Sequence, residues 1–249
     1  MARTANVNIK WLTPLSRASG WMTPPATSAF TVTGIPQTLS QTFDAAGNVA
    51  TRAWSGGKSQ TFTWDAFGEL VKVVQTGVEP YTWTASYDGL GRRLETAFTP
   101  TTEPLTPPTV VRSIFDPQAE FLEIGVAVGG LQQWKLFGPD LHGGSLNGTG
   151  GLEVVIAPGG TVGAINDAFG NVVASVAQNN TVTWSPVKVG GYGPLPEYTA
   201  PTLEGGASLI ESSTWRTRRV DPTGLVNLGA RHYDPERGNW GSGSIILQN

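Results

Sequence analysis

The chain has 249 residues, of which 39% are hydrophobic and 14% charged, and its formal net charge at pH 7 is -3. This apolar content suffices to bury a core, whereas the weak acidic charge provides no basic surface for nucleic acid. The absence of cysteine excludes disulfides and thiolate metal sites. Abundant glycine and proline, with many β-prone residues, favour short strands joined by turns, so the expected fold class is all-β.

The sequence shows no signal peptide and no run of apolar residues that is long enough for membrane insertion. Residues 1–20 lack the apolar block of about seven or more residues that a secretory signal needs. The longest apolar run, residues 122–131, contains three glycines and is far shorter than the roughly 20 residues that cross a bilayer. We therefore expect a leading segment over residues 1–35, no transmembrane segment and a soluble chain.

A short sequence pattern then recurs: an aromatic residue, Asp, two variable residues and Gly. It occurs at residues 43–47, 64–68 and 87–91, and its flanks alternate between polar and β-prone residues. Each copy therefore predicts a strand, a tight turn and a second strand. The predicted turn residues are Asp44, Gly47, Asp65, Gly68, Asp88 and Gly91.

These residue types have a physical reason in a turn. An Asp carboxylate accepts hydrogen bonds from backbone amides across the turn, and glycine adopts the positive φ that a side chain opposes. The aromatic ring before each Asp is expected to lie across its neighbour in the next hairpin. The pattern predicts an array of antiparallel β-hairpins that forms a curved sheet.

The pattern loosens after residue 100. Residues 99–109 are rich in proline and threonine and predict a surface loop, whereas residues 117–124 are the one place where we expect a short helical turn. Residues 157–160 predict a tight turn, and a further copy of the pattern follows at residues 166–173. Its turn residues are Asp167 and Gly170.

Two Asp-Pro pairs stand near the end of the sequence. They begin at Asp221 and Asp234, and a glycine follows each of them, Gly224 and Gly238. A buried pair of aspartates can share a proton and activate water, so both are weak candidates for catalytic residues. Asp followed by Pro and Gly is also a common turn sequence, and turns at the ends of a hairpin over residues 225–233 account for the same pattern.

The stretch SYDGLGRRLETAF at residues 86–98 resembles the repeat of Rhs, or YD-repeat, proteins, which is named for a Tyr-Asp pair. Residues 215–240 resemble the Rhs-associated core that closes such arrays, especially in the sequences GAR and YDP. The resemblance implies a strip of antiparallel strands that spirals into a shell, as in Tc toxin components, polymorphic toxins and teneurins. In many bacterial members the core also cuts off a carboxy-terminal segment, using two aspartates.

The resemblance implies a single Rhs-type β domain over residues 1–249. Its YD-type repeats span residues 36–182, its core spans residues 183–240, and a tail follows at residues 241–249. Relatives usually carry a further Asp-Pro pair about where this chain has Ser244. We therefore expect the self-cleavage end to be missing.

The expected function is a non-enzymatic structural β scaffold, a shell, encapsulating or surface-assembly element of a bacterial toxin-like system. The resemblance implies an extracellular or cell-surface location, with a cytoplasmic stage before export. Open sheet edges favour self-association or pairing with another Rhs or toxin-complex chain. Two alternatives stay open: a self-processing aspartyl protease core, and a module that binds carbohydrate or a surface receptor through tryptophans.

No other group of residues predicts a metal or cofactor site. His142 and His232 are far apart in the sequence and lack partners at metal-ligand spacing. Ser145 with His142 and Asp140 superficially matches a hydrolase triad but lacks the required elbow sequence. The arginines of residues 216–219 are expected to alternate between the faces of a strand and to pair with local carboxylates.

Overall fold

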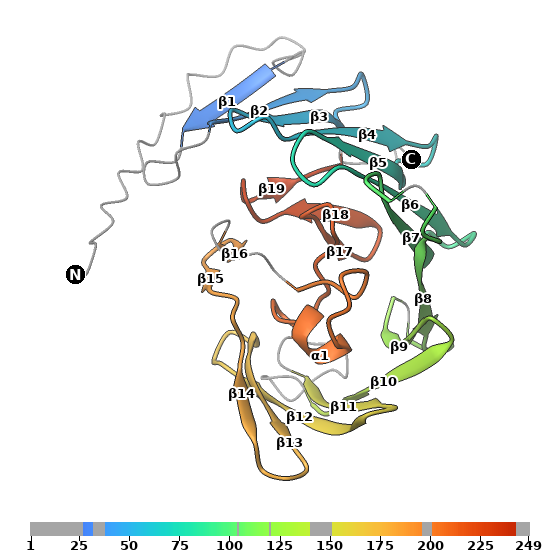
Figure 1. Cartoon of the computed structure of the whole chain (residues 1–249), viewed down its shortest axis with the longest axis vertical. Coiled ribbons are helices and arrows are strands. Elements are labelled where there is room, and N and C mark those ends of the chain that lie inside the picture. The colour runs from blue at the N-terminus through green and yellow to red at the C-terminus, as the bar shows by residue number, and fades with distance from the viewer. Residues whose placement is uncertain are drawn as a thin grey trace, which may run out of the picture.

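Fourteen consecutive strands pair antiparallel with their sequence neighbours and form one continuous sheet (Figure 1). The computed structural model describes residues 27–31, 38–103, 105–119, 121–139, 151–195 and 201–242. The strands of this sheet are β1 (Thr27–Thr31), β2 (Thr38–Phe43), β3 (Val49–Trp54), β4 (Ser59–Trp64), β5 (Leu70–Thr76), β6 (Tyr81–Tyr87), β7 (Arg93–Pro100), β8 (Thr109–Phe115), β9 (Glu123–Val128), β10 (Leu131–Phe137), β11 (Leu152–Ala157), β12 (Gly160–Asn166), β13 (Val172–Ala177) and β14 (Val182–Trp184). The predicted all-β array of antiparallel hairpins is confirmed.

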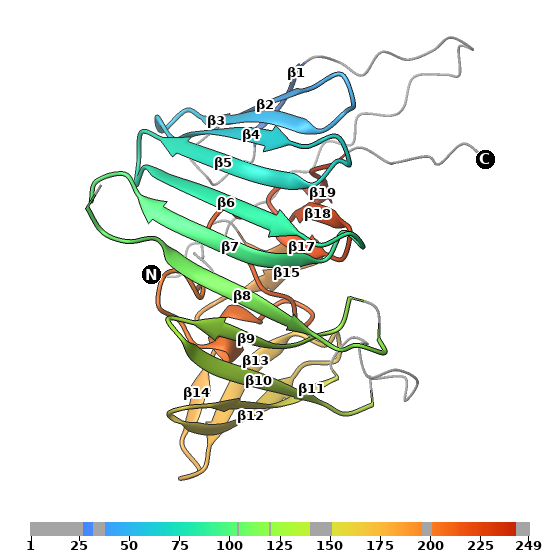
Figure 2. The same ribbon diagram turned by 90° about the vertical axis from the view of Figure 1, so that its right-hand side faces the viewer.

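The carboxy-terminal part of the described chain lies inside the curve of this sheet. We call residues 201–242 the inner segment. Figure 1 shows the sheet bending around it, and Figure 2 shows the strands of the sheet crossing in front of it. Two short strands, β15 (Val189–Gly190) and β16 (Gly193–Pro194), precede the inner segment. The elements of the inner segment are α1 (Leu209–Ser212), β17 (Val226–Leu228), β18 (Arg231–Asp234) and β19 (Asn239–Trp240).

Several strands bury alternate side chains on the face that meets the inner segment. In β4, Gln60 and Phe62 are buried, whereas Thr61 and Thr63 are exposed. Since successive side chains of a strand point to opposite faces, this pattern gives the sheet one buried and one solvated face. The alternation seen in the sequence is thus the alternation between the concave and convex faces of the sheet.

The Asp-x-x-Gly pattern forms the same turn at one end of four hairpins. In the β4–β5 turn, Asp65 Oδ1 accepts hydrogen bonds from the backbone amides of Phe67 and Glu69, both at 2.9 Å. Gly68 closes the turn with a φ of 77°. Corresponding pairs of amide bonds are made by Asp44, Asp88 and Asp167. Two backbone donors of each turn are therefore satisfied by one carboxylate.

Replacing Asp65 by alanine should lower the free energy of unfolding by about 1 to 2 kcal/mol, because two backbone amides lose their acceptor. Asparagine keeps an acceptor oxygen at the same position, so Asp65→Asn should lose less than half as much. Urea unfolding of the two variants measures the difference. Equal losses would contradict this account of the turn.

In three of the four turns, the residue before the turn Asp donates a hydrogen bond to the preceding strand, whereas the sequence predicted a contact with the next hairpin. Trp64 donates its indole N–H to the carbonyl oxygen of Val49, at 2.7 Å, and the Tyr87 hydroxyl donates to that of Leu70, at 2.9 Å. Asn166, which replaces the aromatic residue in the later copy, donates its amide to the carbonyl of Leu152. A polar hydrogen-bond donor is therefore the shared property of these three positions.

The hydrophobic core lies between the concave face and the inner segment. One cluster packs Val111, Val126 and Leu152 of the sheet against Leu209 of α1. A second cluster contains the fully buried Trp83 and, from the inner segment, Leu225. Burial of apolar surface from both the sheet and the inner segment stabilises this arrangement. The two parts of the chain therefore contribute to common hydrophobic clusters.

One expectation about local structure is corrected. Residues 117–124 contain bends and the start of β9, with no helical turn in the described part of this stretch. The α-helix of the described residues is α1, which begins with a capping box between Ser208 and Glu211. The predicted hairpin near residues 225–233 forms, as β17 and β18, but in a separate three-stranded sheet. No helix among the described residues has the length and apolarity that crossing a membrane requires.

Candidate functional site

A row of buried polar side chains crosses five strands on the concave face of the sheet. Its members lie directly opposite one another in register from β2 to β6, and all are at most 6% exposed. Cross-strand neighbours share one face of a sheet, so the row presents its polar groups to the inner segment. We call these residues the polar row: Gln41, Arg52, Gln60, Gln75 and Tyr81.

One end of the polar row binds the second Asp-Pro element. Gln41 donates its amide to Asp234 Oδ2 at 3.1 Å, and Arg52 Nη2 lies 3.5 Å from Asp234 Oδ1. The same Arg52 nitrogen lies 2.5 Å from Glu236 Oε2. Asp234 and Arg52 are both almost fully buried, so hydrogen bonds from these side chains replace hydrogen bonds from water to the carboxylate.

The other end of the polar row binds the backbone of the first Asp-Pro element. Gln60 Nε2 donates to the carbonyl oxygen of Thr223 at 3.2 Å, and the Tyr81 hydroxyl donates to that of Pro222 at 2.9 Å. Burial raises the pKa of Tyr81 above its usual value, so the hydroxyl keeps its proton for this bond. The turn after Asp221 is therefore fixed to the sheet by neutral donors.

Asp221 itself binds the sheet through a two-pronged ion pair. Arg93 of β7 places Nη1 2.5 Å from Asp221 Oδ2 and Nη2 2.9 Å from Asp221 Oδ1. Burial alone would lower the pKa of Arg93, but the carboxylate of Asp221 outweighs it and raises that pKa. Planar guanidinium and carboxylate groups match in this geometry, which makes the pair specific as well as strong.

The two candidate aspartates therefore belong to two different clusters. Asp221 lies against Arg93, and Asp234 lies against Arg52 and Gln41. Only Asp234 uses its carboxylate within its own turn, where Oδ1 accepts the amide of Glu236 at 3.0 Å. The carboxylate of Asp221 is diverted to the sheet, although its backbone turn closes with the same Gly-to-Asp hydrogen bond as in the array.

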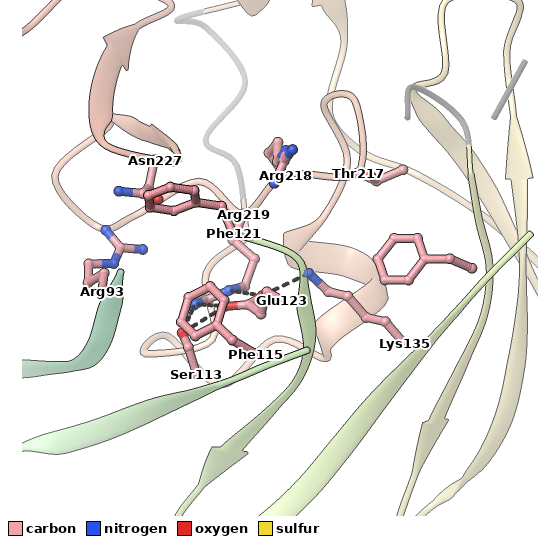
Figure 3. Close-up of a pocket in the computed structure, with 12 residues that line it drawn as sticks. Arg93, Ser113, Phe115, Phe121, Glu123, Lys135, Thr217, Arg218, Arg219 and Asn227 are labelled. Carbon is pink, nitrogen blue, oxygen red and sulfur yellow. Dashed lines mark hydrogen bonds and ion pairs between the residues drawn. The ribbon is translucent and has the colours of Figure 1, made fainter. Parts of the chain in front are cut away.

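A third ionic cluster joins the inner segment to β9 and β10. Arg219 places Nη2 2.6 Å from Glu123 Oε2, and Lys135 Nζ lies 2.8 Å from Glu123 Oε1 (Figure 3). Burial alone would raise the pKa of Glu123, but these two cations outweigh it and hold that pKa well below its usual value. The prediction that the arginines of residues 216–219 pair with local carboxylates is wrong for Arg219, whose partner lies on β9.

His232 is a buried histidine of the inner segment. Its side chain is 1% exposed, and its ring lies edge-on to that of Trp64 at 5.8 Å between centroids. Burial lowers the pKa of His232 to about 3, with a smaller contribution from the charge of Arg93. The imidazole is therefore neutral at physiological pH.

The remaining residues predicted from the sequence either lie in turns of the structure or fall outside the described residues. Gly224 and Gly238 both adopt positive φ, at 79° and 67°, in the turns that follow the two candidate aspartates. Asp140, His142, Ser145 and Ser244 lie outside the described residues. Within the described ranges, no three His, Cys, Asp or Glu residues gather in a way that could bind a metal ion.

The polar row was missed in the sequence because strand patterns assign polar residues to the solvent side. The signal was nevertheless present: Gln41 has the same period-two parity as Leu39, and Gln60 the same parity as Phe62. A polar residue in phase with the apolar positions of a strand predicts a buried polar partner on that face.

Comparisons with known proteins give structural neighbours alone. No protein-family model and no curated protein matches the sequence. A crystal structure of TcdB2-TccC3-TEV is 16% identical with a TM-score of 0.49, and it is matched over 83% of this chain and 12% of that chain. The Photorhabdus luminescens Tc holotoxin pore is 16% identical with a TM-score of 0.46, over 85% of this chain and 12% of that chain. The present chain thus spans about an eighth of the length of these neighbours.

Proposed function

We propose that the chain is a non-enzymatic structural β scaffold of Rhs type, an element of the wall of a bacterial toxin-like assembly. The observation that carries this proposal is the use of both candidate aspartates to fasten the inner segment to the sheet. The resemblance of residues 215–240 to the Rhs-associated core supports the assignment to the Rhs type. In this proposal Asp221 and Asp234 are docking residues, and the Asp-x-x-Gly residues of the array serve its turns.

The environment of the two aspartates supports a structural role. A general base needs an oxygen that reaches both water and substrate, and a shared-proton pair needs its two carboxyl groups in contact. Asp221 and Asp234 are 2% and 0% exposed, and hydrogen-bond donors of the sheet occupy both carboxylates. A carboxylate in such a position stabilises the fold by neutralising a buried arginine.

The outer strand of the sheet supports assembly through strand pairing. β14 pairs with β13 on one side, and its side chains Val182 and Trp184 are 46% and 72% exposed. An exposed apolar edge strand favours pairing with another strand. In this proposal the edges of the sheet join a second copy or another toxin-complex chain, at the cell surface or outside the cell.

Intact-mass measurement of the purified chain tests the non-enzymatic part of the proposal. The protein should keep its full mass during days of incubation between pH 5 and pH 8, and Asp234→Asn should give the same result. A product cut within the last thirty or so residues of the chain, and absent from the Asp234→Asn variant, would replace the proposal with a self-processing protease core.

Two substitutions in β14 test the proposed assembly through strand pairing. Val182→Lys with Trp184→Lys should weaken self-association at least tenfold in sedimentation velocity, since charged edges resist strand pairing. Thr61→Lys with Thr63→Lys is the matched control, because both exposed threonines belong to the inner strand β4. A wild-type chain that stays monomeric at 100 μM or so, or equal weakening by both pairs, would contradict assembly through β14.

A further inference from the structure

The last strand of the large sheet has one open side. β14 lies at the opposite end of the sheet from β1 (Figure 1), and among the described strands it pairs with β13 alone. The amide of Ser185 donates to the carbonyl oxygen of Val173 at 2.9 Å. Since the backbone groups of successive strand residues point to opposite sides, Ser185 and Thr183 direct theirs toward β13. The N–H and C=O groups of Val182 and Trp184 therefore point away from β13, toward the open side of β14.

The apolar side chains of β14 lie on the concave face of the sheet. Trp184 is opposite Ala174 in register, and Val182 is opposite Val176. Opposite residues of a strand pair share a face, and Ala174 is 1% exposed on the face that meets the inner segment. Trp184 is nevertheless 72% exposed, beside a cavity of about 30 Å³ that Ala174 and Ile210 also line. One more strand beside β14 would cover this exposed ring.

Two features limit the stretch of β14 that can pair. Asn180 has a φ of 65° just before the strand, a conformation that does not continue a strand. Pro186, two residues beyond Trp184, has no N–H to donate. The outward groups of Val182 and Trp184 thus form the pairing stretch, and they are placed symmetrically about Thr183.

We propose that β14 pairs antiparallel with β14 of a second copy of this chain, about a two-fold axis at Thr183. In this register Val182 of each copy is opposite Trp184 of the other, and both pairs exchange N–H to C=O hydrogen bonds. Sliding the strands by two residues would bring Pro186 or Asn180 into the pairing. A shift of one residue would oppose groups that point away from the partner strand. The symmetric register is the one that satisfies both outward residues of each copy.

The side chains of a second copy fit this edge as well. In the antiparallel register Trp184 of each copy lies beside Val182 of the other on the concave face, so the exposed ring gains an apolar neighbour. A parallel pairing would place Trp184 opposite Thr183 and join the concave face of one sheet to the convex face of the other. The two-fold contact is self-complementary and closed. This inference rests on the proposed assembly through β14, and it specifies the partner, the register and a limit of two chains at this edge.

Cysteine cross-linking tests the register, because the chain contains no cysteine of its own. Thr183 faces Thr183 of the second copy across the axis as a pair without hydrogen bonds, with Cα atoms about 4.5 Å apart. This separation lies within the roughly 4.4 to 6.8 Å that a disulfide spans. Under oxidised glutathione, Thr183→Cys should therefore form disulfide-linked dimers about tenfold faster than Thr181→Cys, or more.

Thr181→Cys is the matched control for chance collisions between thiols. Thr181 is also exposed, but its Cα atoms in the two copies would lie about 14 Å apart in this register, beyond the reach of a disulfide. Adding Val182→Lys and Trp184→Lys to Thr183→Cys should reduce cross-linking to the rate of this control. Near-ultraviolet circular dichroism of the reduced variants confirms that each is folded.

Sedimentation velocity of the wild-type chain separates this inference from the proposed function. The inference predicts an equilibrium between monomer and dimer. Association of the wild type, with equal cross-linking rates for the two cysteine variants, would overturn the register and leave assembly through β14 standing. Larger species that the β14 lysines abolish would indicate head-to-tail pairing with the other edge of the sheet, which would also overturn it. A wild-type chain that stays monomeric would contradict the proposed assembly itself.

Discussion

Replacing Arg93 by methionine should lower the free energy of unfolding by about 3 to 5 kcal/mol, the largest loss expected for a single substitution in this chain. Arg93 and Asp221 are 4% and 2% exposed and meet through two hydrogen bonds of 2.5 and 2.9 Å. Methionine removes the guanidinium but leaves the carboxylate of Asp221 buried without its cation. Equilibrium unfolding in urea measures the loss.

Two comparisons separate this ion pair from a general effect of charge. Arg93→Met with Asp221→Asn removes both charges and should recover about 2 kcal/mol or more of the loss, because no uncompensated ion is then buried. Arg112→Gln breaks an exposed pair with Glu95 and should lose less than about 1 kcal/mol. An Arg93→Met loss as small as that of Arg112→Gln would contradict a docking role for Asp221.

Acid should destabilise the fold through His232 well before the ordinary carboxylates titrate. The pKa of His232 is about 3 in the folded chain against 6.5 in the unfolded one, so the unfolded chain binds the proton first. The stabilisation from the neutral ring is complete above pH 6.5 and is lost as the pH falls. The loss from this group is about 2 kcal/mol at pH 5 and about 3 kcal/mol at pH 4.

The variant His232→Phe isolates this contribution. Phenylalanine keeps a ring beside Trp64 and cannot take up a proton. The difference in unfolding free energy between wild type and variant should therefore shift by about 2 kcal/mol between pH 7 and pH 5. Contributions from Glu123 and Glu204 cancel in this difference, because both chains contain them. A difference that stays constant over this range would show that His232 does not remain neutral and buried.

Local structure could be predicted from the sequence because its determinants are local. The spacing of Asp65 and Gly68, with alternating strands on either side, specifies a hairpin without reference to any distant residue. Repetition of the unit then predicts one antiparallel sheet, since neighbouring hairpins bury their apolar sides against one another. The turn, the strands and the fold class follow from these short-range patterns.

The partners of the docking residues could not be predicted in the same way. Arg93 and Asp221 are 128 residues apart, and Gln41 and Asp234 are 193 apart. The period-two pattern can place a polar residue on the buried face of its strand, but it does not identify the distant residue that becomes its partner. The reversal of the chain into the curve of the sheet decides this, and that reversal depends on the sum of many contacts between the sheet and the inner segment. The resemblance indicated the Asp-Pro elements but not which strands would bind them.

Native-state hydrogen exchange tests most directly whether the sheet and the inner segment are one cooperative unit. Backbone amides of Val226 and Tyr233 in the inner segment should open with the same free energy as those of Val73 and Trp83 in the sheet, to within about 1 kcal/mol, because buried ion pairs and shared cores join them. Opening of the inner segment several kcal/mol below that of the sheet would contradict the account, since the aspartates would then not fasten one to the other.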